Sequence, residues 1–239
     1  MEDPRANDLV IITGASKGVG RATVIALIRQ HGAQVLAISR DGAALGTLMD
    51  ECRGGPGTLE AVAIDLSAPN CADEVRSAVA GRKVRALVHN AGHLLSRRMG
   101  EHTPADLGHL FHVNVVAPLL VSQTLADALA GDPPGHIVHI GSMGGFQDSV
   151  KFPGLVGYSA SKAALACVAQ CLAEEFKERG IRSNCLALGS VDTDMLRAAF
   201  PGFRSPTTAG EMGAFVAEFA LHGHKLFNGK VLPVASTTP

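Results

Sequence analysis

Tyr158 is the only tyrosine among the 239 residues, and Lys162 follows it four positions later. On a helix, this spacing places both side chains on one face, one turn apart. A phenol has an ordinary pKa of about 10, and a fixed ammonium group nearby favours the phenolate and lowers that pKa. Moving it to about 7 requires roughly 4 kcal/mol of differential stabilisation. The pair is suited to moving a proton to or from an alcohol oxygen, although the same spacing also occurs on helices by chance.

A glycine-rich turn near the N-terminus is suited to binding a pyrophosphate. The segment Thr13–Gly20 reads Thr-Gly-Ala-Ser-Lys-Gly-Val-Gly and follows an apolar run. Its glycines let the backbone approach a phosphate, and the start of the next helix directs N–H groups toward it. The spacing is GxxxGxG instead of GxGxxG, and no Gly-Lys-Ser/Thr follows, so it is not a Walker motif. Between a buried strand and a helix, this turn predicts a dinucleotide site.

The end of the next apolar run indicates which dinucleotide binds. That run ends in Ser39 and Arg40, and Lys17 lies in the first turn. Two cations and a hydroxyl suit the 2′-phosphate of NADP(H), whereas NAD(H)-binding proteins usually place an acid here. Asp41 comes next, and we expect it to point outward or to begin the next turn. The alternative is that Lys17 and Arg40 are ordinary surface charges.

A parallel sheet is the expected support for these groups. Short apolar runs without polar alternation are typical of strands buried on both faces. They predict strands at 9–13, 34–39, 59–65, 84–89, 136–140, 181–188 and 230–235, with helices at 18–31, 104–130 and 156–179. This alternation predicts an α/β fold, a Rossmann-like doubly wound parallel sheet of about seven strands with helices on both faces. We see neither a linker nor an internal repeat, so we expect one domain over 1–239, with 193–210 as its least readable segment.

Composition and missing motifs exclude several classes of protein. The net charge is −1 and the chain has no block of basic residues, so we expect no nucleic-acid partner. We find no apolar run long enough to span a bilayer, and the polar N-terminus is unlike a signal peptide. We therefore expect no membrane partner. Five cysteines without CxxC fit reduced thiols, so we expect a cytoplasmic protein. The ten histidines form no HExxH, so no metal is expected. The nucleophile elbow of a hydrolase requires a glycine two residues before the serine. For Ser142 that position is Ile140, so a hydrolase is not expected.

Four separated motifs together resemble the short-chain dehydrogenase/reductase family. They are the glycine turn Thr13–Gly20, Asn90-Ala-Gly92, Ser142, and the Tyr158–Lys162 pair sixteen residues after Ser142. Asn114, in His112-Val-Asn-Val-Val, is similar to a fourth catalytic residue of that family. The resemblance covers nearly the whole chain, from Leu9 to about Ala235.

The resemblance implies a role for each catalytic residue. Tyr158 would be the acid toward a carbonyl or the base toward an alcohol, and Ser142 would polarise the substrate oxygen. Lys162 would lower the pKa of Tyr158 and hold the nicotinamide ribose, while Asn114 would hold a water that links Lys162 to solvent. The resemblance also implies a cofactor site formed by Gly14, Ser16, Lys17, Gly18, Val19, Gly20, Ser39, Arg40, Asp65, Leu66, Asn90, Ala91, Gly92, Tyr158, Lys162, Gly189, Val191 and Thr193.

The expected activity is that of an NADP(H)-dependent carbonyl reductase or alcohol dehydrogenase. Its substrate would be small to medium and mostly apolar, bound by residues that include His93, Met143, Phe152, Leu155, Leu196 and Phe200. For His93 a solvated loop position is the open alternative. Three departures from the family pattern are His89 before Asn90, Leu188 before Gly189, and the absence of paired glycines near the C-terminus. None of them removes a catalytic group.

Two expectations concern partners and a rival function. The apolar residues of 104–130 recur at helical spacing, and in the relatives this helix and the 156–179 helix form a dimer contact. A homodimer or homotetramer is therefore expected, although the apolar face could be entirely internal. The rival is a non-catalytic NADP(H)-binding regulator or scaffold of the same fold. Relatives of that sort commonly lose the tyrosine or the lysine, and this chain retains both.

Overall fold

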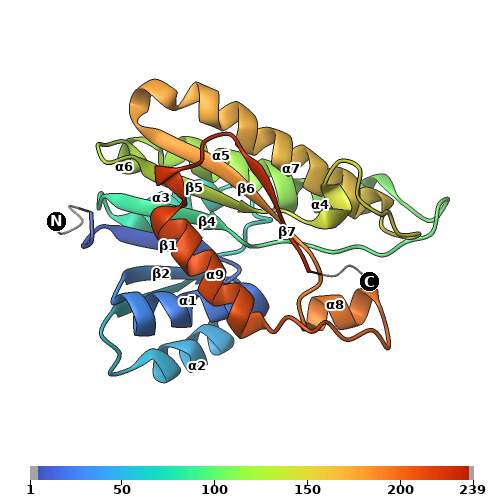
Figure 1. Cartoon of the computed structure of the whole chain (residues 1–239), viewed down its shortest axis with the longest axis horizontal. Coiled ribbons are helices and arrows are strands. Elements are labelled where there is room, and N and C mark those ends of the chain that lie inside the picture. The colour runs from blue at the N-terminus through green and yellow to red at the C-terminus, as the bar shows by residue number, and fades with distance from the viewer. Residues whose placement is uncertain (1–4, 237–239) are drawn as a thin grey trace.

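The computed structural model describes residues 5–236, so residues 1–4 and 237–239 of the expected domain lie outside the described part. Seven strands form one parallel sheet in the order β3-β2-β1-β4-β5-β6-β7 (Figure 1). The strands are β1 Leu9–Thr13, β2 Gln34–Ser39, β3 Thr58–Ala63, β4 Val84–His89, β5 Gly135–Ile140, β6 Ile181–Leu188 and β7 Val231–Val234. This order confirms the predicted doubly wound α/β fold, because the chain starts in the middle and winds outward in both directions.

Helices cover both faces of the sheet (Figure 1). One layer contains α1 Gly18–His31, α2 Gly42–Cys52 and α9 Ala209–His222. The other contains α3 Cys71–Val79, α4 Pro104–Phe111, α5 Ala117–Thr124, α6 Ala126–Leu129 and α7 Val156–Glu175. The short helix α8, Asp194–Ala199, lies near the end of the sheet where β6 ends.

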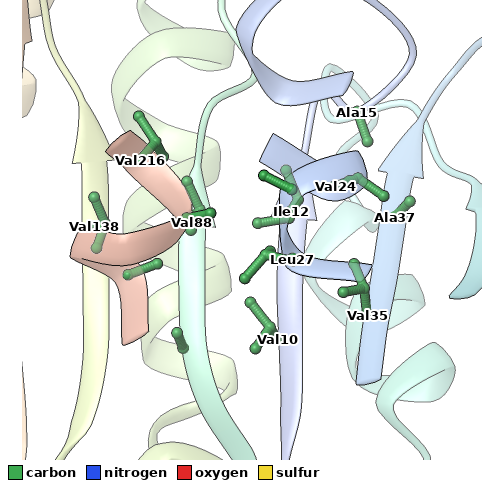
Figure 2. Packing of buried hydrophobic residues seen from close by; sticks show 14 of the residues in the cluster. Val10, Ile12, Ala15, Val24, Leu27, Val35, Ala37, Val88, Val138 and Val216 are labelled. Carbon is green, nitrogen blue, oxygen red and sulfur yellow. The ribbon is translucent and has the colours of Figure 1, made fainter. Parts of the chain in front are cut away.

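Strand β1 shows how the two layers are held to the sheet. Val10 and Ile12 pack into the cluster on the α1 and α9 side, whereas Leu9 and Ile11 pack into the opposite cluster. Successive side chains of a strand point to opposite faces, so an entirely apolar strand supplies both cores. Figure 2 shows the first cluster, in which Leu27 of α1 and Val216 of α9 lie over the strands.

Several predicted elements differ from the observed ones. The helix expected over 104–130 is interrupted by a π-helical turn, His112–Val116, and ends with the separate helix α6. The helix expected over 156–179 ends at Glu175 and continues as a 3-10 turn. Helices α2, α3 and α9 were not predicted, and the uncertain segment 193–210 contains α8.

The helical stretch Pro104–Thr124 corrects the expectation that no stretch is long and apolar enough to cross a membrane. It has 21 residues and a mean hydropathy of 1.2. Ala117 and Val121 pack into the core cluster on that side of the sheet. About a third of the window is buried, and its exposed large apolar side chains are Val116 and Leu119, each at 38%.

Candidate active site

One cavity of about 340 Å³ lies at the carboxyl ends of the strands, where β1 and β4 lead their following segments to opposite faces. All the predicted site residues line it except Gly20 and Asn114. The structure thus brings together segments that are far apart in the sequence: the glycine turn, the ends of β2 and β4, the segment after β5, the start of α7 and the segment after β6.

Asn90 holds the glycine turn in place. Its side-chain Nδ2 donates to the carbonyl oxygens of Thr13 and Gly14, each at 3.0 Å. The Thr13 hydroxyl in turn accepts from the backbone N–H groups of Asn90 and Ala91, both at 3.1 Å. Gly14 has a φ of +68°, which favours glycine. Gly20 packs beneath the turn, because a Cβ there would lie 2.2 Å from Asn90 Nδ2, so it shapes the turn without lining the cavity.

The end of β2 forms a small polar site beside the turn. Ser39 donates from its hydroxyl to the Ser16 hydroxyl at 2.9 Å. Lys17 and Arg40 are exposed, and within residues 5–236 neither side chain has a hydrogen bond or an ion pair. Asp41 caps α2 by accepting from Ala44 N at 3.0 Å, which agrees with the expectation that it begins the next turn. Two cations that form no hydrogen bond within the described residues, together with two hydroxyls in one cavity, fit a phosphate monoester.

Asp65 and Leu66, which are expected to flank the adenine, line the cavity. Asp65 accepts from the Ser67 backbone and hydroxyl at 2.9 and 2.8 Å, and these hydrogen bonds lower the pKa of its carboxyl group. After β6, Thr193 caps α8 by accepting from Leu196 N at 3.3 Å. A Cβ on Gly18 would lie 3.4 Å from the Thr193 methyl, so the glycine turn and the segment after β6 face each other.

Ser142, Tyr158 and Lys162 meet on one wall of the cavity. Ser142 follows β5, and its hydroxyl accepts from Gly144 N at 3.1 Å, which fixes its direction. Ser142 lies close to the phenol of Tyr158 and lowers its pKa. Lys162 is one turn further along α7, and its ammonium group lies 5.9 Å from the centre of the tyrosine ring. Only 4% of Lys162 is exposed.

The charge state of this wall corrects one expectation. We expected Lys162 to lower the pKa of Tyr158, but burial raises the pKa of Tyr158, and only the neighbouring Ser142 opposes that rise. The reason is the direction of Lys162, whose Nζ donates to the Ile140 carbonyl oxygen at 2.8 Å. Burial also lowers the pKa of Lys162 to about 8. In the protein by itself, Tyr158 is therefore a neutral phenol at neutral pH, which is the form that donates a proton.

Asn114 lies behind the wall and ties three segments together. It is fully buried in the π-helical turn, a local widening that is frequent at functional sites. Its amide donates to His93 O and to Ser161 Oγ, both at 2.9 Å, and its Oδ1 accepts from His93 N at 2.7 Å. Ser161 donates to the Tyr158 carbonyl at 2.7 Å. Asn114 thus connects the segment after β4 to the turn of α7 that carries Tyr158.

Gly145 sets the distance between the Ser142 segment and α7. A Cβ there would lie 2.6 Å from both Ala163 N and Lys162 C. Gly145→Ala should therefore displace the turn Met143–Gly145 from α7 and separate Ser142 from Tyr158. We expect kcat/KM to fall by about tenfold or more, because reacting groups depend on their positions within an ångström.

Steady-state kinetics beside thermal unfolding would check this prediction. Gly46→Ala is a suitable control, because Gly46 is exposed on α2 and a Cβ there meets nothing within 4 Å. A Gly145→Ala protein with unchanged kcat/KM would contradict the proposed packing.

The remaining wall is mostly apolar and includes the six residues predicted to contact the substrate. Phe152 and Phe200 meet edge to face, with ring centres 5.0 Å apart and planes at 76°. His93 is half-buried, and its ring lies 4.9 Å from that of His109. Burial and the neighbouring His109 lower the pKa of His93. Its position in the cavity wall disagrees with the alternative of a solvated loop residue.

Fourteen lining residues were not named individually, although Leu94, Gly144, Asp194, Met195 and Ala199 lie within the stretches 93–95, 143–147 and 191–203 that were expected to line the pocket. Most are apolar neighbours of predicted positions, and His109 on α4 stands out because it faces the cavity through its pairing with His93. The helical spacing of His109 and Val113 was a usable signal, since they share a face of one helix. The additional lining residues are Ile38, Ile64, Ser67, Leu94, His109, Val113, Ile140, Gly141, Gly144, Leu188, Ser190, Asp194, Met195 and Ala199. Within the described part of the chain, no group of three or more His, Cys, Asp or Glu residues is placed to hold a metal.

The chain is similar in sequence and fold to known proteins. The chain is 34% identical to protein FixR of Bradyrhizobium diazoefficiens over 201 residues, which are 79% of this chain and 68% of FixR. It is 33% identical to carbonyl reductase [NADPH] 2 of Sus scrofa over 79% of this chain and 73% of that protein. A crystal structure from Beutenbergia cavernae, described as an NAD(P)-dependent gluconate 5-dehydrogenase with bound NADP, superposes with a TM-score of 0.84. It shares 30% identity with this chain and covers 95% of each chain.

The family model of the short chain dehydrogenases matches residues 8–202, which contain every catalytic residue predicted above. The predicted fold, family and class of enzyme are thereby confirmed. The chain belongs to the short-chain dehydrogenase/reductase family of oxidoreductases.

Proposed function

We propose that the protein is an NADP(H)-dependent carbonyl reductase or alcohol dehydrogenase for a small to medium, mostly apolar substrate. One observation carries the proposal: a single cavity joins the glycine turn to a wall that contains Ser142, Tyr158 and Lys162. The predicted cofactor agrees with the relatives, since the pig relative is named for NADPH and the Beutenbergia structure contains NADP. When bound, the nicotinamide supplies or accepts the hydride.

The protein's own groups would hold and protonate the substrate oxygen. Ser142 and Tyr158 line the same cavity, so a carbonyl oxygen bound between them would accept from both hydroxyls and be polarised. The neutral phenol of Tyr158 then donates its proton as negative charge develops on that oxygen. Lys162 would leave the Ile140 carbonyl to hold the nicotinamide ribose and would favour the phenolate that remains. Asn114 keeps α7 and the segment after β4 in register during this step.

The residues present fit the cofactor. The backbone of the Gly14–Gly20 turn would hold the pyrophosphate, and the polar site of Ser16, Lys17, Ser39 and Arg40 would hold the 2′-phosphate. Asp65 and Leu66 would flank the adenine, while Val191 and Thr193 would hold the nicotinamide amide.

Arg40→Asp should weaken NADPH binding by about 100-fold and leave NADH binding within a few fold. The substitution removes a charge-assisted hydrogen bond and places a carboxylate beside the 2′-phosphate. Titration calorimetry with both cofactors would check this result. Arg53→Asp is a matched control, because Arg53 is exposed at the far end of α2 and does not line the cavity. Equal losses for NADPH and NADH would contradict the assignment.

The function is tested by NADPH oxidation with a broad panel of aldehydes and ketones. We expect turnover of apolar carbonyl compounds and preference for NADPH over NADH. A protein that binds NADPH and turns over nothing in the panel would favour the rival, a non-catalytic regulator or scaffold. The chain retains all four predicted catalytic residues, and each of them interacts with a neighbour in or behind the cavity wall, which argues against that rival.

The remaining predictions concern the state of the protein in the cell. Val116 of the π-helical turn, Leu119 of α5 and Val156 of α7 are exposed by 38%, 38% and 50%. These apolar side chains support the predicted homodimer or homotetramer. A cytoplasmic location, the absence of membrane and nucleic-acid partners, and a single domain over 1–239 stay predictions.

A further inference from the structure

We propose that Phe152 and Phe200 form an aromatic clamp that selects carbonyl substrates bearing a flat aryl group. This inference rests on the function proposed above and names the substrate class of the same site. The two rings come from segments 48 positions apart, the segment before α7 and the residue that ends α8. Both are half-buried and both line the cavity, so each keeps part of its surface directed to a ligand.

The geometry of the pair favours a third aromatic ring. The rings are 5.0 Å apart at 76°, so the edge of one meets the face of the other. Aromatic rings extend such contacts by offset stacking on a free face and by edge-to-face contact at a free edge. An aryl group between the clamp and the catalytic hydroxyls can make both contacts at once. A saturated ring of the same size has no quadrupole and gains only the burial of its surface.

The polar side chains of this wall can hydrogen-bond one substrate oxygen and few other polar groups of a substrate. Ser142, Tyr158, His93 and His109 are hydrogen-bonding side chains of the cavity wall, the two histidine rings pack against each other, and Leu94, Met143, Leu155 and Leu196 are apolar. Asp194 also lines the cavity, but its carboxylate accepts from Arg197 at 2.8 Å. A sugar or sugar acid would bury several hydroxyls without partners, each at a cost comparable to a lost hydrogen bond. The clamp therefore separates this chain from the gluconate 5-dehydrogenase that it resembles in fold.

Because an aryl ketone is planar, the clamp would orient its carbonyl group as well as its ring. Conjugation keeps the carbonyl group in the plane of the ring, so fixing the ring also fixes which face of the carbonyl carbon meets the nicotinamide. Holding the reacting atoms in one orientation lowers the entropic part of the barrier. We therefore expect the clamp to raise kcat as well as to lower KM, and to give one product enantiomer in excess.

The test compares acetophenone, cyclohexyl methyl ketone and a ketose with NADPH in the full-length protein. Acetophenone should have a kcat/KM about fivefold or more above that of cyclohexyl methyl ketone, and the ketose should show negligible turnover. Phe152→Leu and Phe200→Leu should each remove most of the preference for the aryl ketone. The double variant should lose little more than either single variant, because the two rings act as one unit.

Controls separate the clamp from the fold and from the proposed function. Phe203→Leu alters a half-buried phenylalanine of the same segment that does not line the cavity, and it should keep the wild-type preference. Phe152→Tyr keeps the ring and should retain the preference, while NADPH affinity reports an intact fold. Equal turnover of the aryl and cyclohexyl ketones by the unmutated protein overturns the clamp and leaves the function standing. No oxidation of NADPH with any carbonyl compound overturns the function itself.

Discussion

Tyr158→Phe should reduce kcat for carbonyl reduction by a factor of about 100 to 10,000 while leaving NADPH affinity within a few fold. The substitution removes only the hydroxyl that lies beside Ser142 and is proposed to donate the proton. A positioned general acid contributes a rate factor of this order. Single-turnover oxidation of NADPH with an apolar ketone would measure the loss, and calorimetry would measure the affinity. A Tyr158→Phe protein with the wild-type kcat would overturn the mechanism.

The same residue offers a direct reading of its charge state. Because the chain contains one tyrosine, ultraviolet absorbance follows the ionisation of this phenol without overlap. In the protein by itself, the phenol should ionise above its ordinary pKa of 10, since burial raises that pKa. Binding of oxidised NADP should lower the pKa, as Lys162 turns from Ile140 toward the ribose and the cofactor adds positive charge. A pKa near 10 in the complex would count against the proposed role of Lys162.

The fold and the walls of the cavity could be predicted because they depend on local pattern. Fully apolar runs such as 9–13 predict strands that are buried on both faces, and the ends of those strands carry the glycine turn, Asn90 and Ser142. In a parallel sheet these ends meet at one edge, so residues far apart in sequence come together without further information. Two missed helices also had signals: Asp41 caps α2, and Thr208 with Glu211 forms the capping box of α9.

The charge relations within the site could not be predicted, because they depend on where individual side chains point. The Tyr158–Lys162 spacing is correct for one helix face, yet the ammonium group is directed to a carbonyl on β5 that no pattern in α7 reveals. The π-helical turn at Asn114 is a second example, since a local widening of the backbone has no signature in residue type. Hydrogen-bond partners across elements decide both features.

The buried histidines should make the protein strongly sensitive to acid. Burial lowers the pKa of His89 and of His136 to about 3, and that of His139 well below its ordinary value. His89 pairs with Ser122 at 2.8 Å and its ring stacks on His139 with centres 5.0 Å apart. His136 must carry its proton on Nδ1, because that atom lies 3.1 Å from the Ala220 carbonyl oxygen. A second proton would place a charge in the core between β4, β5 and β6.

The sign of the pH effect follows from these lowered values. In the unfolded chain, each histidine takes up its proton near pH 6.5, whereas the folded protein does so only near pH 3. Stability is therefore full above about pH 6.5 and falls as the pH falls toward 3. Each histidine contributes a slope of about 1.4 kcal/mol per pH unit, so at pH 5 each costs about 2 kcal/mol. Against a typical total of 5–15 kcal/mol, two such groups remove a large share of the stability.

Urea unfolding between pH 8 and pH 4 would measure this loss in the protein without cofactor. His89→Asn and His136→Gln replace an imidazole with an amide that does not titrate, and each should flatten the slope below pH 6.5 by about 1.4 kcal/mol per pH unit. If His89→Asn and His136→Gln both keep the wild-type slope, these buried rings are not the groups that take up protons when the protein unfolds in acid.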